Sequence, residues 1–91
     1  MVVDKNIFQK KGELQVARER RQELRISADV IVKGMLVLFD PMDIDCVYVD
    51  TYDEMKLKIY VQDLHKKRLA LDTINKRIEQ LEKELGANAD E

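Results

Sequence analysis

Residues 37–49 read Val-Leu-Phe-Asp-Pro-Met-Asp-Ile-Asp-Cys-Val-Tyr-Val and join two short apolar runs through an acidic link that contains proline. Residues 40–43 have the chemistry of a turn. Proline presets φ near about −65°, and Asp40 can accept a hydrogen bond from the backbone two residues on. The run at 46–49 is mostly β-branched or aromatic, which favours a strand. The segment therefore predicts a strand, a turn and a second strand.

Two further runs extend this prediction to a three-stranded antiparallel β-meander over residues 30–61. Its strands are expected at 30–39, at 44–50 and at 55–61. In the third run apolar residues alternate with residues that are mostly polar, and a period of two is typical of a half-buried strand. The exposed edges of such a small meander need cover.

Helices are predicted on both sides of the meander, over residues 6–28 and 62–85, because good helix formers dominate there. The heptad positions of the first helix are Leu14, Ala17, Arg21, Leu24 and Ala28. Those of the last helix, with Lys67 as the polar member, are Leu64, Leu71, Ile74, Ile78, Leu81 and Leu85. A regular apolar stripe on a polar helix needs another helix against it, so this seam predicts self-association. Gly86 is the expected helix C-cap, and residues 86–91 are the expected tail.

The predicted fold class is therefore α+β, in a single small domain over residues 1–91. The alternative is an all-α antiparallel helical hairpin with the acidic segment as its tip. In that case the heptads would continue through Ile31, Met35, Leu38, Leu57 and Tyr60. Residues 51–54 would then form a capping box. The β-branched residues at 30–32 and the alternation at 55–61 favour the meander instead.

Residues 34–49 read Gly-Met-Leu-Val-Leu-Phe-Asp-Pro-Met-Asp-Ile-Asp-Cys-Val-Tyr-Val, which resembles a segment of the bacteriophage Mu-type transposases. In that family a small β-barrel follows the catalytic domain and supports DNA and protein contacts. The resemblance implies a barrel-like central segment and an accessory role in transposition. The family's chemistry belongs to an RNase-H-like domain of roughly 100 residues or more, for which this chain has no room. Residues 52–54 replace the glycine-containing turn that follows in the family.

Composition bounds the remaining possibilities. A chain of 91 residues buries a modest core and often relies on a partner. The single cysteine, Cys46, excludes an internal disulfide and fits a reducing, cytoplasmic location. No apolar run reaches ~18 residues, and the start of the chain lacks the order of a secretory signal. We therefore expect no membrane partner.

The usual catalytic constellations cannot be assembled from these residues. His65 is the only histidine, which excludes a histidine relay or a histidine-rich metal site. Asp40, Asp43 and Asp45 offer oxygen ligands, but their spacing misses the calcium-loop pattern. The three glycines are scattered, so there is no phosphate-binding loop. We expect a protein with no catalytic residues, no metal and no cofactor.

The charges are sorted along the chain. Residues 40–54 hold six acids and no base. The basic groups that could contact DNA phosphates or an acidic partner are Arg18, Arg20, Arg21, Arg25, Lys66, Lys67, Arg68, Lys76 and Arg77. Phosphate contacts position a protein without reading base sequence.

Together these observations predict a non-catalytic accessory or assembly module. Its role is linked to transposition through the family resemblance, with homo-oligomers, dimers first, and DNA as partners. The alternative function is a structural coiled-coil oligomerisation protein with no DNA role.

Overall fold

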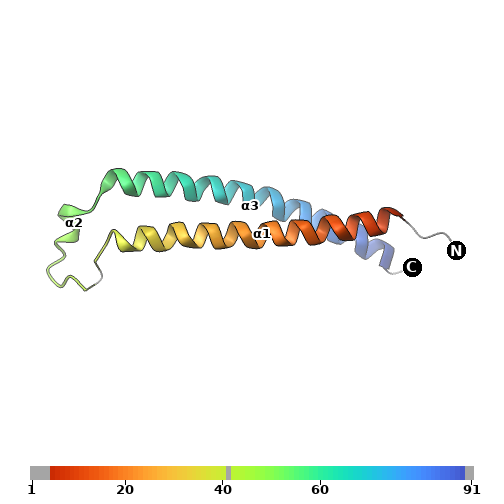
Figure 1. Cartoon of the computed structure of the whole chain (residues 1–91), viewed down its shortest axis with the longest axis horizontal. Helices are drawn as coiled ribbons and strands as arrows, with labels where there is room; N and C mark the ends of the chain where they lie inside the picture. Colours follow the sequence, from red (N-terminus) through yellow and green to blue (C-terminus); the bar gives the residue numbers. More distant parts are fainter. Residues whose placement is uncertain (1–4, 41, 90–91) are drawn as a thin grey trace.

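The computed structural model describes residues 5–40 and 42–89 and consists of two long helices joined by a loop (Figure 1). Helix α1 spans Lys5–Val37, the short α2 spans Tyr48–Thr51, and α3 spans Glu54–Ala89. The two long helices run antiparallel and pack along each other as a hairpin that measures 72 × 22 × 15 Å. At a rise of about 1.5 Å per residue each is roughly 50 Å long.

The β-meander predicted over residues 30–61 is wrong, because the part of this range that the structure describes contains no strand. Helix α1 continues to Val37, and α3 begins at Glu54, before the third predicted strand. The fold class is therefore all-α rather than α+β. The alternative architecture, an antiparallel helical hairpin with an acidic tip, is confirmed.

The burial pattern explains why the alternation at 55–61 was misleading. Leu57 and Tyr60 are half-buried, whereas Met55 and Ile59 are exposed. A strand would have placed Met55, Leu57 and Ile59 on one face. The half-buried positions instead follow the helical spacing of three and four residues. A run of only seven residues can match this helical spacing and a strand period of two at the same time, so its sequence pattern is ambiguous.

The β-branched residues at 30–32 are accommodated in the same way. Valine and isoleucine lower helix propensity by only a few tenths of a kcal/mol per residue relative to good helix formers. Most helical stability comes from packing an apolar face, and Ile31 and Met35 extend that face of α1 with half-buried side chains. Tertiary packing therefore outweighs local propensity in this segment.

The resemblance to Mu-type transposases is not supported either. It depended on strands in residues 34–49, but these residues form the end of α1, part of the loop and the start of α2. The segment cannot be a piece of a β-barrel, so it carries no argument for a role in transposition.

Both long helices extend beyond their predicted bounds. Helix α1 runs nine residues past residue 28 before it ends at Val37. Helix α3 continues through Gly86, whose φ is not positive, to Ala89. The helix therefore does not end at Gly86, and the last two residues of the expected tail lie outside the described part of the chain.

The buried core lies in the half of the hairpin next to the termini. Its residues are Leu14, Ala17 and Leu24 from α1 and Ile78 and Leu81 from α3. All except Leu24 form one cluster, against which Ile74 and Leu85 pack. All of these residues belong to the predicted heptad seams.

Candidate interaction surface

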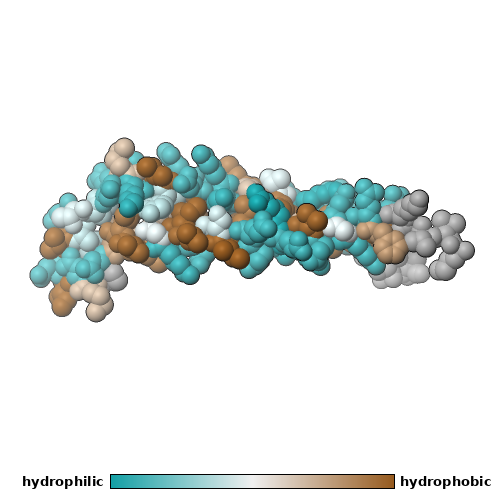
Figure 2. All heavy atoms as spheres, in the orientation of Figure 1, coloured by the Kyte–Doolittle hydropathy of each residue, from teal (hydrophilic) through white to brown (hydrophobic). Residues whose placement is uncertain are grey.

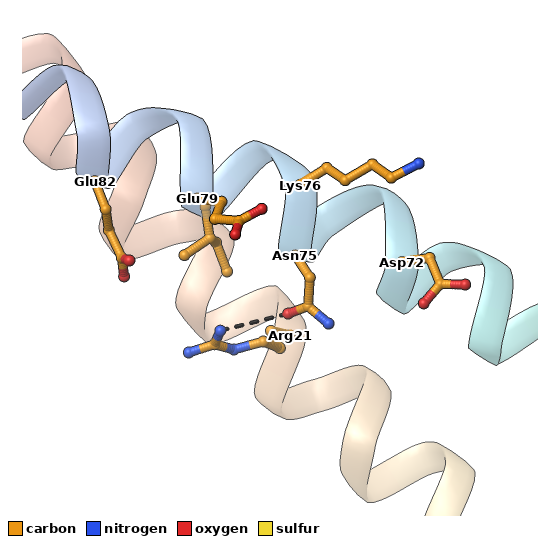
Figure 3. Close-up of a pocket in the computed structure, with 7 residues that line it drawn as sticks. Arg21, Asp72, Asn75, Lys76, Glu79 and Glu82 are labelled. Carbon is orange, nitrogen blue, oxygen red and sulfur yellow. Dashed lines mark hydrogen bonds between the residues drawn. The ribbon is translucent and has the colours of Figure 1, made fainter.

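A polar pair interrupts the seam near its middle. Arg21 occupies a heptad position on α1, and its guanidinium donates a hydrogen bond to Oδ1 of Asn75 on α3 at 3.4 Å. Figure 3 shows these side chains pointing toward one another, while Lys76 extends away from α1. A polar residue at one heptad position specifies the register of paired helices at some cost in stability.

This pair opens onto a recess with a mixed polar lining. The other lining residues are Asp72, Lys76, Ile78, Glu79 and Glu82. The recess contains both signs of charge, and its lining residues include no nucleophile paired with a base.

Ion pairs join the helices toward the termini. Arg77 to Glu13 measures 2.9 Å, and Arg18 to Glu82 measures 3.1 Å, each between nitrogen and oxygen. The third pair joins Lys10 to Glu84 at 3.3 Å. Exposed pairs of this kind contribute about 0–1 kcal/mol each, so they help to set the register more than they stabilise the fold.

An open apolar groove runs between the helices closer to the loop. Its volume is about 350 Å³, and its lining residues are Ala28, Val61, Leu64, His65, Arg68 and Leu71. Val32 and Leu36 follow Ala28 on α1 at intervals of four residues, toward the loop. Leu36 and Val61 are exposed. The groove therefore presents an apolar strip with two basic groups on its α3 wall.

We define the loop-proximal half of the hairpin as residues 25–40 and 42–71. Its helices carry most of the exposed large apolar side chains, namely Ile26, Val30, Val32, Leu36, Val37, Val49, Met55, Ile59, Val61 and Leu69. Among the described side chains of the other half only Phe8 and Val16 are of this kind. Figure 2 shows the brown, apolar atoms gathered over the loop-proximal half on the face in view. Exposed apolar area and buried core are thus separated along the molecule.

The loop, which forms the tip of the hairpin, is held by its own carboxylates. Oδ1 of Asp40 accepts a hydrogen bond from the Met42 backbone N–H at 3.0 Å, which confirms the predicted turn at this aspartate. Asp43 accepts two more, from the N–H groups of Asp45 at 3.1 Å and Tyr48 at 3.0 Å. These bonds order the part of the loop that leads into α2.

Asp53 supplies the N-cap of α3. Its Oδ1 accepts a hydrogen bond from the N–H of Lys56 at 3.0 Å, which satisfies a backbone donor of the first turn. In the helical-hairpin alternative, a capping box of residues 51–54 was expected at this helix start. Thr51 instead lies in α2, where its hydroxyl donates to the carbonyl of Val47 at 3.2 Å.

Three aromatic rings pack together beneath the tip. The ring centroid of Phe39 lies 5.8 Å from that of Tyr48 and 5.4 Å from that of Tyr52. The apolar residues further out have no such cover, since Met42 is 84% and Ile44 95% exposed. The tip is therefore ordered but displays both apolar and acidic side chains.

The nine basic residues predicted to contact phosphates or a partner are not gathered on one surface. Arg21 and Lys76 line the polar recess, and Arg68 lines the apolar groove. A separate surface depression is lined in part by Arg20, Lys66 and Lys67. Carboxylates of the same chain already pair with Arg18, Arg20, Arg68 and Arg77. DNA contact through these residues stays a prediction.

The predicted oligomer seam divides into two parts. Ile74, Ile78, Leu81 and Leu85 belong to or pack against the core formed with α1 of the same chain. Leu64 and Leu71 are half-buried and line the apolar groove. The role of these six residues between chains stays a prediction.

The groove residue Val61 was missed because it fell in a predicted strand. Ala28, Leu64 and Leu71, which also line the groove, occupy expected heptad positions. The place of Val61 relative to α1 depends on how α3 packs against α1, which no local spacing specifies.

The remaining reactive groups do not assemble into a site. Cys46 is exposed and has a left-handed backbone with φ of 56°. No three potential metal ligands gather within the described residues. Lys33, whose ammonium lies 2.8 Å from Oδ2 of Asp29, is the titratable group most clearly perturbed, and this hydrogen bond raises its pKa.

Comparison with protein-family models, with curated proteins and with solved structures found no match to this chain. Neither long helix, within the described residues, includes an apolar stretch sufficient to cross a membrane.

Proposed function

We propose that this protein is a non-catalytic assembly module, a helical hairpin that associates with a second copy of itself through its loop-proximal half. One observation carries the proposal: the exposed large apolar side chains of the helices are concentrated in that half, whereas the buried core lies in the other. Clusters of exposed apolar residues on soluble chains mark surfaces that are covered by a partner.

The small core supports the same conclusion. Five hydrophobic residues are buried among the described side chains, whereas the long helices contain 33 and 36 residues. A hairpin of this length therefore gains stability when a partner covers more of its apolar surface.

Two hairpins that face each other would form a four-helix bundle, a common solution for amphipathic helices. The hairpin is 72 Å long and 22 Å wide, so half of its length offers a face on the order of 800 Å². A stable interface of standard size buries about 800 Å² per partner. The loop-proximal half is thus large enough for a dimer.

Analytical ultracentrifugation tests this proposal directly. We expect the wild-type chain to sediment as a dimer at micromolar concentration. Replacing two exposed apolar residues of this half, Leu36→Gln and Val61→Gln, should shift it to a monomer with its helicity retained. The matched control is Val16→Gln, a valine on the other half that is 65% exposed, which should remain dimeric. A wild-type monomer at high micromolar concentration would overturn the proposal.

The proposal assigns no role in DNA binding and places the chain in the reducing cytoplasm, where the exposed thiol of Cys46 would stay reduced. The acidic tip would repel a phosphate backbone, and four of the nine candidate bases are paired within the chain. A mobility shift of a generic DNA duplex at low salt would contradict this part of the proposal.

A further inference from the structure

We infer that the hairpin also binds an acidic amphipathic helix of a partner protein, in a basic furrow between α1 and α3. The basic furrow consists of two adjoining depressions that share Arg20, Leu24 and Ala70 in their linings. This contact goes beyond the self-association proposed above, because it uses a different face of the hairpin. Its support comes from the place of the furrow, its shape and its uncompensated charge.

The basic furrow opens on the side of the hairpin opposite the apolar groove. On α3, Asp63 and Ala70 line the furrow, whereas Val61 and Arg68, each two residues away from one of them, line the groove. Residues two apart in an α-helix point about 160° apart. A second copy that covers the groove therefore leaves the furrow free for another partner.

The α3 wall of the furrow has the shape of a seat for a helix. Lys66, Ala70, Thr73 and Arg77 recur at intervals of four, three and four residues, so they form one stripe along α3. The stripe is about 16 Å long, which corresponds to about three turns of helix. Its two middle members are small and exposed, so another helix can approach closely between the two cations at its ends.

The floor of the furrow is apolar. Leu24 is buried, and Ile31 and Ile74 are half-buried between the helices. The apolar face of an amphipathic helix would cover this floor, as a third helix laid along a helical pair. A phosphate backbone has no apolar group to place there, so the floor favours a protein helix over DNA as the occupant.

The cations of the furrow are not fully compensated within the chain. Carboxylates at 3.3 and 2.9 Å pair with its two arginines, Arg20 and Arg77. Its two lysines, Lys66 and Lys67, form no ion pair or hydrogen bond with the described residues, and the one acid in the lining is Asp63. Lys67 is half-buried at the polar position of the α3 heptad, where an ion pair is screened less than at an exposed site. The furrow therefore selects a helix whose apolar face is flanked by carboxylates.

Fluorescence anisotropy with a labelled helical peptide tests the inference on the full chain. The probe is a peptide of about 14 residues, long enough to span the furrow, with leucine at heptad positions a and d and glutamate at the flanking positions. Its control peptide has lysine in place of each glutamate. We expect the acidic peptide to bind with micromolar affinity that falls as salt is added, and the basic peptide not to bind.

Two variants locate the binding site. Lys66→Glu with Lys67→Glu should weaken peptide binding by about tenfold or more, through like-charge repulsion. The matched control is Lys76→Glu with Lys83→Glu, which makes the same charge change on the same helix but outside the furrow lining, and Lys76 extends away from α1 (Figure 3). It should keep the wild-type affinity.

Ala70→Gln fills the middle of the stripe without changing charge, so it should weaken peptide binding by about fivefold, whereas a purely electrostatic attraction would not respond. Circular dichroism verifies that every variant keeps its helices.

Several results would overturn the inference and leave the proposed self-association standing. They are an acidic peptide that does not bind, equal affinity of the wild type and the Lys66, Lys67 variant, and equal affinity of the wild type and Ala70→Gln. A generic DNA duplex that binds the wild type and loses affinity in the Lys66, Lys67 variant would assign the furrow to phosphates instead. A wild-type monomer that binds the acidic peptide would remove the proposed self-association and leave this inference intact.

Discussion

At the scale of single residues, Gly34 shows how closely the helices approach. A Cβ atom placed on it would lie 3.1 Å from both Cζ and the hydroxyl oxygen of Tyr60. The tyrosine ring therefore occupies the space that any other residue would fill. Gly12 provides the contrast, because nothing lies within 4 Å of a Cβ placed there.

We predict different outcomes for alanine at these two glycines. Gly12→Ala should stabilise the protein by about 0.5–1 kcal/mol, because alanine is the better helix former. Gly34→Ala should give no such gain, since crowding against Tyr60 costs about 1 kcal/mol. Urea denaturation measures the free energy of unfolding of both variants. In a Tyr60→Leu background the crowding is removed, so Gly34→Ala should then stabilise the protein. Equal stabilisation by the two alanines would contradict the close approach.

At the scale of elements, stability is unevenly distributed along α3. Leu81 is fully buried against α1, whereas Leu69 is 53% exposed. The two leucines have the same side chain on the same helix, so their difference isolates the contribution of packing.

Leu81→Ala should therefore lower the free energy of unfolding by about 2–4 kcal/mol, through lost burial and the cavity that remains. Leu69→Ala should change it by about 0.5 kcal/mol or less. If the alanine at 81 prevents folding, Ile78→Val offers a milder truncation at a core position, with an expected cost of about 1 kcal/mol. Equal effects at the core and exposed positions in urea denaturation would show that the seam is not the core.

At the scale of the whole molecule, folding and association should be coupled. The apolar groove and the tip would be covered only in the dimer, so the dimer stabilises the folded state by mass action. Stability should then depend on protein concentration, which a monomeric hairpin would not show.

A 100-fold increase in concentration should raise Tm by about 5–10 °C for a dimer of this size. The measurement is the loss of helical circular dichroism at several concentrations. The double variant Leu36→Gln, Val61→Gln should have a lower Tm that does not change with concentration. A constant Tm for the wild type would indicate that one hairpin is stable without a partner.

The amino-acid sequence alone was sufficient for the features that depend on local chemistry. The heptad of the last helix, including Ile78 and Leu81, could be read directly because it persists for several turns. The turn at Asp40 followed from the hydrogen-bonding chemistry of its side chain. The sorting of charge into an acidic tip and basic flanks was equally direct.

The tertiary structure decided everything that depends on which surfaces meet. Residues 30–37 and 55–61 are each too short for their apolar pattern to distinguish helix from strand, and only packing of α1 against α3 resolves the two. The same packing creates the groove wall at Val61, the contact of Gly34 with Tyr60 and the ion pairs between helices. These features join residues that are distant along the chain. A local sequence pattern shows which face of a segment is apolar, but it does not show which other segment covers that face.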